Sequence, residues 1–281
     1  MSLSGVNKTL FIPLYGKSLV SRRGIILRDE MAEKIWAKEG FPIGGKSRSK
    51  WLALNMAMRA RVFDDWADEM IRECAGMGAG EQAGAALGGG SDALVLHVGC
   101  GLDSRCLRVK EKAGMWYDCD FPEVIEIRKK YYQESDSYRM VALNAAESDG
   151  IKELPDAPAV IVVLEGISMY LTNEQLRAFL GALEDKYPKV HVLMDIYTEF
   201  GVRASRFKNP VKEVGVNRIY GIDNIDDLTK GLRLHFKAEH TVTPKRLVNE
   251  LSGAEKLFFK VLFTGKLYGK IYRLLEFETI K

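Results

Sequence analysis

The sequence predicts an α/β fold with a doubly wound, mostly parallel sheet of about seven strands. Three observations support it: strand-length apolar runs recur from residue 93 onward, helical patterns separate them, and one run is apolar on both faces. That run, Ala159 to Leu164, holds only aliphatic residues, as is typical of a central parallel strand covered on both sides. Strands that alternate with helices form a parallel sheet with helices on both faces.

The N-terminal third of the chain is predicted to be helical. Asp29 can cap a helix that runs through Met31, Ile35 and Trp36 and ends near Gly40. A second helix is expected from about Ser49 to Cys74, because its apolar residues recur at helical spacing. The glycine-rich stretch that follows, residues 75–91, is expected to be a flexible connection or a poorly formed helix that leads into the sheet.

Strands are expected at residues 93–98, 114–119, 138–143, 159–164 and 190–196. A strand at 232–242 and another near 271–277 are expected to close the sheet. Between the fourth and fifth strands, Thr172 precedes Gln175 with the spacing of a capping box, which predicts the start of a helix.

Composition narrows the function classes. The chain has 281 residues, 47% hydrophobic and 28% charged, and its net charge of +3 is too small to indicate a nucleic-acid partner. No apolar run is long enough to span a bilayer, so no membrane partner is expected. No secretory signal is visible, and the four cysteines lack metal-ligand spacing, so we expect free thiols in the cytoplasm and no metal.

A glycine turn and an acid carry the main functional signal. The first strand enters the turn Gly99-Cys100-Gly101, and the second strand ends at Asp120. A strand, a glycine turn and an acid about 20 residues later describe a nucleoside pocket on a parallel sheet. Ser104 occupies the position of the third glycine of the dinucleotide motif. The pattern therefore favours a nucleoside without phosphates, such as S-adenosylmethionine (SAM), over a dinucleotide, although an NAD-dependent dehydrogenase remains an alternative.

Four sequence blocks together resemble the leucine carboxyl methyltransferase family, and within it the polyketide-type O-methyltransferases. The blocks are Leu14–Ser18 with Ser21–Arg23, Gly99–Arg105, Trp116–Val124 and Glu165–Leu171. The resemblance covers roughly residues 10 to 200. It implies the class I, Rossmann-like methyltransferase fold and the transfer of a methyl group from SAM to a carboxylate or hydroxyl of a small molecule, with S-adenosylhomocysteine as the other product. A non-catalytic SAM-binding protein is a second alternative.

The resemblance also implies a layout for the chain. We expect one methyltransferase domain over residues 1–281. Residues 1–90 would form a helical lid and linker, 91–197 the SAM-binding core, and 198–281 a cover over the acceptor site together with the last strands. The sequence does not indicate an oligomeric state.

SAM is expected at the glycine turn and the neighbouring strand ends. Gly99 and Gly101 would let the turn pass under the methionine part, while Asp120 would accept hydrogen bonds from both ribose hydroxyls. Phe121 is a candidate for flanking the adenine, although an aromatic residue there is as often core. Asp118 is interpreted as a structural acid.

The third strand ends at Asn144, where related enzymes usually carry an acid for the adenine amino group. The amide oxygen of Asn144 can still accept such a hydrogen bond. Ala145 would offer its backbone N–H to the ring.

The methionine half of SAM needs charged partners. Glu165 ends an apolar strand, where a carboxylate must meet a cation. The SAM ammonium is the favoured partner, with Gly166 leaving room for it, and an internal salt bridge is the alternative. Lys17 and one of Arg59 and Arg61 are candidates for a ligand carboxylate, and the choice between the two arginines stays open.

Three residues near the reaction centre have less specific roles. Arg105 could brace the loop through Asp103 or contact a ligand carboxylate. Tyr170 is the candidate for contacting the acceptor, with core packing as an equal alternative. His97 is interpreted as a core histidine, because it lies in the middle of a strand. The lack of an obvious general base slightly favours a carboxylate acceptor, which needs none.

Overall fold

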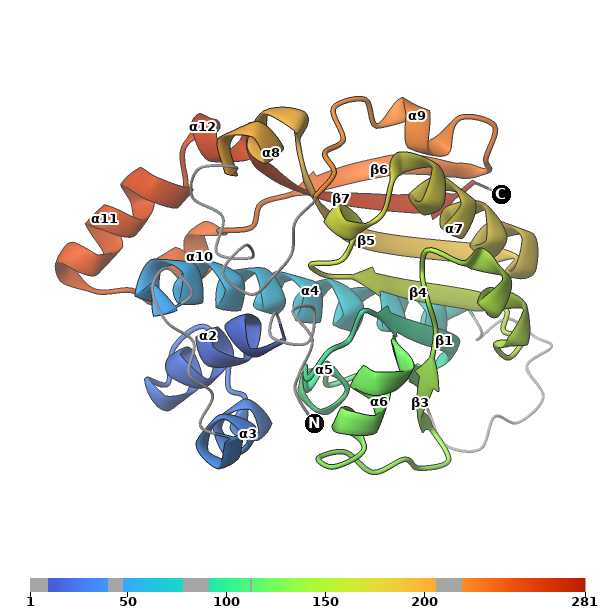
Figure 1. Cartoon of the computed structure of the whole chain (residues 1–281), viewed down its shortest axis with the longest axis horizontal. Coiled ribbons are helices and arrows are strands. Elements are labelled where there is room, and N and C mark those ends of the chain that lie inside the picture. Colours follow the sequence, from blue (N-terminus) through green and yellow to red (C-terminus); the bar gives the residue numbers. More distant parts are fainter. Residues whose placement is uncertain (1–9, 40–47, 78–90, 112, 206–218, 281) are drawn as a thin grey trace.

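The computed structural model describes residues 10–39, 48–77, 91–111, 113–205 and 219–280. A seven-stranded sheet lies at the centre, in the order β3-β2-β1-β4-β5-β7-β6 (Figure 1). The first five strands are parallel, and β7 is antiparallel to both β5 and β6. The strands are β1 (Ser91–Val98), β2 (Ala113–Asp120), β3 (Tyr138–Ala142), β4 (Ala159–Leu164), β5 (Lys189–Tyr197), β6 (Leu234–His240) and β7 (Tyr272–Thr279). All seven predicted strands are confirmed.

Two long helices cover the two faces of the sheet. On one face α4 (Lys50–Met77) packs against alternate residues of the central strands, among them Val95 and Ile161. On the other face α7 (Asn173–Lys186) packs against the residues between them, such as Leu96 and Val162. Side chains alternate along a strand, so a strand covered on both faces must be apolar throughout. Every residue of β4 is buried, as predicted.

The predicted helix starts are confirmed. The Asp29 carboxylate accepts a hydrogen bond from the Ala32 N–H at 2.8 Å, which caps α3 (Glu30–Glu39). Thr172 and Gln175 form the expected capping box at the start of α7. The predicted helix from Ser49 corresponds to α4, which continues to Met77, and residues 78–90 of the predicted connection lie outside the described residues.

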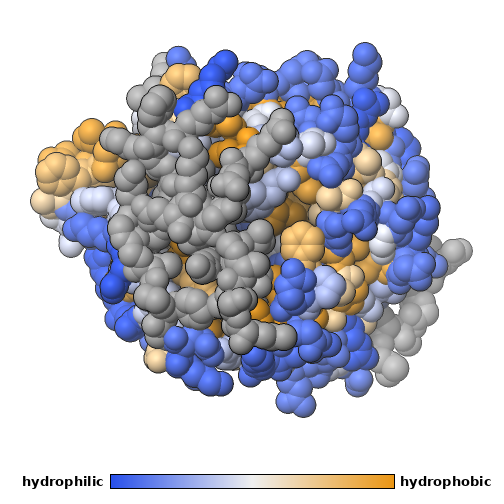
Figure 2. Space-filling view, in the orientation of Figure 1, coloured by the Kyte–Doolittle hydropathy of each residue, from blue (hydrophilic) through white to orange (hydrophobic). Residues whose placement is uncertain are grey.

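An N-terminal pair of helices, α2 (Phe11–Arg22) and α3, lies beside the start of α4 (Figure 1). Shorter helices flank the sheet elsewhere: α5 (Arg105–Arg108), α6 (Pro122–Arg128), η2 (Ser148–Glu153), η3 (Ser168–Tyr170), α8 (Glu199–Ser205), α9 (Asp226–Thr229), α10 (Lys245–Val248), α11 (Gly253–Phe263) and α12 (Lys266–Gly269). Figure 2 shows a largely hydrophilic surface with hydrophobic side chains gathered over α11, at the left edge of the view. Across the described ranges, none of the helices is both long and apolar enough to cross a membrane.

The strand order fixes where a ligand can bind. The chain leaves β1 toward β2 on one side, while β4 lies on the other side of β1. At such a switch point the loops after the strands diverge and open a crevice beyond the carboxyl ends of the strands. The glycine turn, Asp120 and Glu165 all follow or end these three strands. The topology therefore brings the predicted site residues to one place.

Candidate functional site

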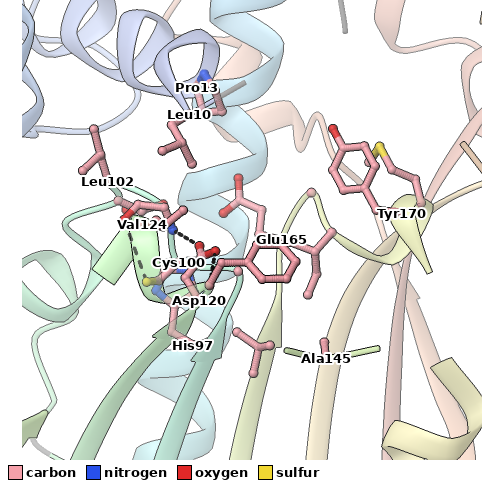
Figure 3. Close-up of a pocket in the computed structure, with 18 of the residues that line it drawn as sticks. Leu10, Pro13, His97, Cys100, Leu102, Asp120, Val124, Ala145, Glu165 and Tyr170 are labelled. Carbon is pink, nitrogen blue, oxygen red and sulfur yellow. Dashed lines mark hydrogen bonds between the residues drawn. The ribbon is translucent and has the colours of Figure 1, made fainter. Parts of the chain in front are cut away.

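A pocket of about 210 Å³ opens at the carboxyl ends of β1, β2 and β4, and α2 and α4 supply its far wall (Figure 3). It is lined by most of the predicted site residues: Lys17, Arg59, Gly99, Gly101, Asp120, Phe121, Asn144, Ala145, Glu165, Gly166 and Tyr170. Residues that are distant in the sequence thus meet around one cavity.

The glycine turn forms the floor of the pocket. Gly99 and Gly101 have φ angles of +69° and +52°, which side chains disfavour. A Cβ on Gly99 would lie 2.0 Å from Cγ2 of Ile167, so the turn can approach the loop after β4 only because this residue has no side chain.

Asp120 ends β2 with its carboxylate toward the turn (Figure 3). It accepts hydrogen bonds from the N–H of Gly101 and of Phe121, each at 2.8 Å. Burial raises the pKa of Asp120 to about 6, against the effect of these two donors. Each carboxylate oxygen has a second lone pair. The group can therefore hold the turn and still accept hydrogen bonds from a ligand.

Phe121 and the Asn144 loop form the neighbouring wall. The Phe121 side chain remains partly exposed to the pocket. The Asn144 amide donates to Glu147 at 2.8 Å and accepts from the N–H of Ala146 at 3.0 Å. Asn144 thus stabilises its own turn and presents the Ala145 backbone beside it to the cavity.

The opposite end of the pocket is charged and closely paired. Glu165 accepts from Arg59 at 2.9 Å and pairs with Arg105, so it does form internal salt bridges as well as facing the cavity. Lys17 pairs with Asp103 at 2.6 Å. Burial alone would raise the pKa of Glu165, but the two arginines outweigh it and hold that pKa below its usual range. Glu165 is therefore ionised at neutral pH.

The two arginines left open by the sequence are now distinguished. Arg59 lines the pocket, whereas Arg61 points away from it and pairs with Asp65 at 2.8 Å. Positions two apart on a helix face nearly opposite directions, so one helix cannot bring both to one cavity. The structure therefore places Arg59, and not Arg61, at the pocket; a cofactor contact by Arg59 stays a prediction.

Arg105 is held entirely by partners within the protein. Its side chain is fully buried and lies outside the pocket lining. It donates to Asp64 and His97 at 2.8 and 2.9 Å and pairs with Glu165. A guanidinium with this many fixed partners holds the turn after β1 against α4. Of the two roles expected for Arg105, these contacts favour bracing of the loop over contact with a ligand carboxylate.

His97 and Asp118 form a second buried cluster beneath the turn. The Nδ1 of His97 lies 3.0 Å from Asp118, and its Nε2 faces Arg105. Since an arginine can only donate, Nε2 accepts and the ring is neutral. Burial and the positive charge of Arg105 lower the pKa of His97. Asp118 also pairs with Arg128, so both residues have partners within the protein, although His97 also lines the pocket.

Sequence reasoning missed the groups that hold Arg59. Arg59 pairs with the buried Asp195 at 2.8 Å and donates to the Tyr272 hydroxyl at 2.5 Å. The N–H of Gly166 donates to the same aspartate at 2.8 Å. Asp195 lies near the end of β5. A polar residue near the end of an apolar parallel strand is the signal that could have pointed to it.

Beyond Gly166 the pocket is mostly apolar. Met56, Met169, Tyr170 and Tyr197 line this part, and Figure 3 shows Tyr170 across the cavity from Asp120 and Glu165. Burial raises the pKa of Tyr170, so its hydroxyl keeps its proton at neutral pH. Tyr197 ends β5, as Asp120 ends β2. Because ligands bind at the carboxyl ends of parallel strands, this position could have identified Tyr197 from the sequence.

Comparisons with known proteins show what the chain is similar to. The family model described as "Leucine carboxyl methyltransferase" matches residues 4–184. The tetracenomycin polyketide synthesis O-methyltransferase TcmP of Streptomyces glaucescens is 29% identical over 239 residues, 82% of each chain. The S-adenosyl-L-methionine-dependent methyltransferase dpfgK of Gibberella zeae is 23% identical over 66% of this chain and 63% of its own.

A solved structure shows the same fold. A putative methyltransferase from Thermobifida fusca superposes with a TM-score of 0.54 at 12% identity, covering 90% of this chain and 88% of its own. The dehydrogenase alternative finds no support in these comparisons. The chain belongs to the leucine carboxyl methyltransferase family and is a SAM-dependent O-methyltransferase.

Proposed function

We propose that this protein transfers the SAM methyl group to the carboxylate of a small, largely apolar molecule, giving a methyl ester and S-adenosylhomocysteine. The observation that carries the proposal is the continuous pocket, which joins the glycine turn and Asp120 to an apolar end beside Tyr170. The relative TcmP is an O-methyltransferase of polyketide synthesis, which also supports a small-molecule acceptor.

The adenosine half of SAM fits the end of the pocket at β2. The carboxylate of Asp120 would accept from the ribose hydroxyls, and Phe121 would lie against the adenine. The Asn144 amide oxygen already accepts from Ala146 but has a second lone pair for the ring edge, and the backbone of Ala145 lies beside it. Gly99 and Gly101 leave backbone, rather than side chains, beneath the ligand.

The methionine half of SAM fits the charged end. Arg59 and Lys17 would bind its carboxylate, and the ionised Glu165 would accept from its ammonium. All three side chains are buried and already paired within the protein. Their positions are therefore fixed before the ligand arrives, and little side-chain entropy is lost on binding.

Methyl transfer requires alignment more than acid–base chemistry. SAM supplies a methyl group that is already activated on a sulfonium centre, and correct orientation of the reactants can lower the barrier by about 7–11 kcal/mol. The charged end and the acid at β2 would fix the donor from two sides. The apolar residues Met56 and Met169 would exclude water and orient the acceptor.

A carboxylate acceptor matches the groups at the apolar end. Tyr170 retains its proton and so can donate a hydrogen bond but not act as a base. His97 is committed to Asp118 and Arg105 through its two ring nitrogens. A carboxylic acid is already ionised at neutral pH and needs no base, whereas an alcohol does.

We also propose that the reaction takes place in the cytoplasm. The four cysteines are all free thiols, and three of them are buried. Burial raises the pKa of Cys100 and Cys119, which keeps these thiols protonated and unreactive. Free thiols persist in a reducing compartment.

The test is product analysis with purified protein and SAM. Aromatic and aliphatic carboxylic acids, phenols and alcohols are supplied in parallel, and S-adenosylhomocysteine release is measured for each. We expect turnover with an apolar acid and a product that mild alkali hydrolyses, as an ester requires. An alkali-stable methyl ether would show a hydroxyl acceptor. Tight S-adenosylhomocysteine binding without turnover on any acceptor would favour a non-catalytic SAM-binding role.

A further inference from the structure

Helix α11 is apolar on two faces, and only one of them is covered. Phe259 is buried against the α4 side of the core, and Phe263 packs beside it. Four other side chains point outward: Leu257 (65% exposed), Phe258 (59%), Val261 (75%) and Leu262 (52%). We call these four residues the α11 stripe. Contiguous exposed apolar side chains of this size are typical of a surface that binds a partner.

The stripe forms one continuous surface. Positions 257, 258, 261 and 262 are spaced one and four apart, which places them on one side of a helix. Figure 2 shows hydrophobic side chains over α11, where the helix projects at the edge of the molecule. Trp51, at the start of α4, extends the surface, and its ring lies 6.2 Å from that of Phe258.

Basic side chains lie beside this apolar surface. Lys256 and Lys260 lie on α11 itself, and the ammonium of Lys50 lies 4.5 Å above the Trp51 ring. From Ser252 to Lys270 the sequence has lysines at four positions and a single acid, Glu255. That acid is bound internally, by Arg23 at 2.6 Å and by Lys50 at 3.8 Å. Glu250, before the helix, accepts from the backbone of Ile26.

We propose that the α11 stripe and its lysines dock the protein on an anionic lipid bilayer. An amphipathic helix with apolar residues on one side and lysines beside them lies in the interface of such a membrane. The apolar side chains enter the boundary between headgroups and acyl chains, and the lysines meet acidic headgroups. We expected no membrane partner because the sequence has no segment that could span a bilayer. Docking on the membrane surface does not require such a segment.

A second copy of the chain fits this surface less well. In a two-fold dimer the same patch faces itself, which would bring the lysines beside the stripe of one subunit into the same interface as those of the other. Glu255 is already paired within its own subunit and offers little compensation. An anionic lipid surface satisfies both the apolar stripe and the positive charge.

The test is co-flotation of the full-length protein with vesicles. One set is phosphatidylcholine alone, and the other contains phosphatidylglycerol as well. We expect at least about tenfold greater partitioning into the anionic vesicles, weakened by salt because the attraction is screened. Blue-shifted emission that is lost in Trp51→Phe would place Trp51 at the lipid interface.

Matched variants test which residues are responsible. Leu257→Ser should lower partitioning by about tenfold, because it removes a large apolar side chain from the interface. Leu107→Ser is the control, since Leu107 is equally exposed (63%) but lies on α5, and it should change nothing. Lys256→Glu with Lys260→Glu should abolish binding to anionic vesicles. S-adenosylhomocysteine binding should survive in each variant and thereby report correct folding.

Three results would overturn the proposal. One is an absence of partitioning by the wild-type protein into either vesicle set. Another is equal loss in Leu257→Ser and Leu107→Ser. The third is a concentration-dependent dimer, seen by light scattering, that Leu257→Ser dissociates while vesicle binding is absent, because the stripe would then be a subunit interface.

Discussion

The two ends of the pocket are built in different ways. At the β2 end, a glycine turn and Asp120, about 20 residues apart, meet through two adjacent parallel strands. At the charged end, Glu165 collects partners from α4 and α5, and Arg59 in turn is held by β5 and β7. The first end depends on local backbone conformation, whereas the second depends on charges that compensate one another over long sequence separations. Loss of a single residue should therefore affect the two ends differently.

The largest effect is expected at the charged end. Glu165→Ala leaves the buried Arg59 and Arg105 without their shared carboxylate. Removing one partner of a buried ion pair costs about 3–5 kcal/mol, so the free energy of unfolding should fall by that amount in urea titration. The control is Asp149→Ala, which breaks an exposed ion pair with Lys152. This variant should leave the free energy of unfolding unchanged. Equal stability of both variants would show that the ion pairs of Glu165 do not stabilise the fold.

The next effect concerns the glycine turn. Gly99→Ala combines a positive φ with a contact of 2.0 Å to Ile167, and we expect a loss of about 2–4 kcal/mol together with weaker S-adenosylhomocysteine binding. Gly24→Ala shares the positive φ but has open space around it, so it should cost only about 1 kcal/mol. Combining Gly99→Ala with Ile167→Ala should recover part of the loss. Equal costs at both glycines would contradict the close approach.

A smaller effect, seen in binding rather than in folding, is expected at the β2 end. Asp120→Ala removes the acceptor assigned to the ribose hydroxyls, and S-adenosylhomocysteine affinity should fall by at least about tenfold in calorimetry. Glu123→Ala removes a nearby exposed acid and should leave the affinity unchanged. An unaltered affinity in Asp120→Ala would refute the ribose assignment.

The smallest effect is a pH dependence that separates the two ends. The pKa of Asp120 is about 6, so the carboxylate is mostly protonated at pH 5 and ionised at pH 7. If the ionised form binds the ribose, affinity should rise by up to about tenfold from pH 5 to pH 7 and then level off. Glu165, whose pKa is lowered, contributes no change in that range. Binding that weakens as the pH rises, or a slope retained in Asp120→Ala, would contradict this assignment.

The same contrast explains what the sequence could predict. The strands, the caps at Asp29 and Thr172, and the position of Asp120 follow from local patterns, and all were predicted. Arg61 was not excluded, because a sequence motif does not say which way a helix faces. Asp195 and Tyr272 were missed since their partner, Arg59, lies well over a hundred residues away. The roles of the site residues, and the single domain over residues 1–281, stay predictions.

Helix α4 connects the α11 stripe to the pocket. It begins beside the α11 stripe at Trp51 and reaches the pocket at Arg59. Eight residues of helix rise about 12 Å, less than half the thickness of the hydrocarbon core of a bilayer. If the α11 stripe docks on a bilayer as proposed, this one helix would hold the pocket at a short, fixed distance from the membrane surface.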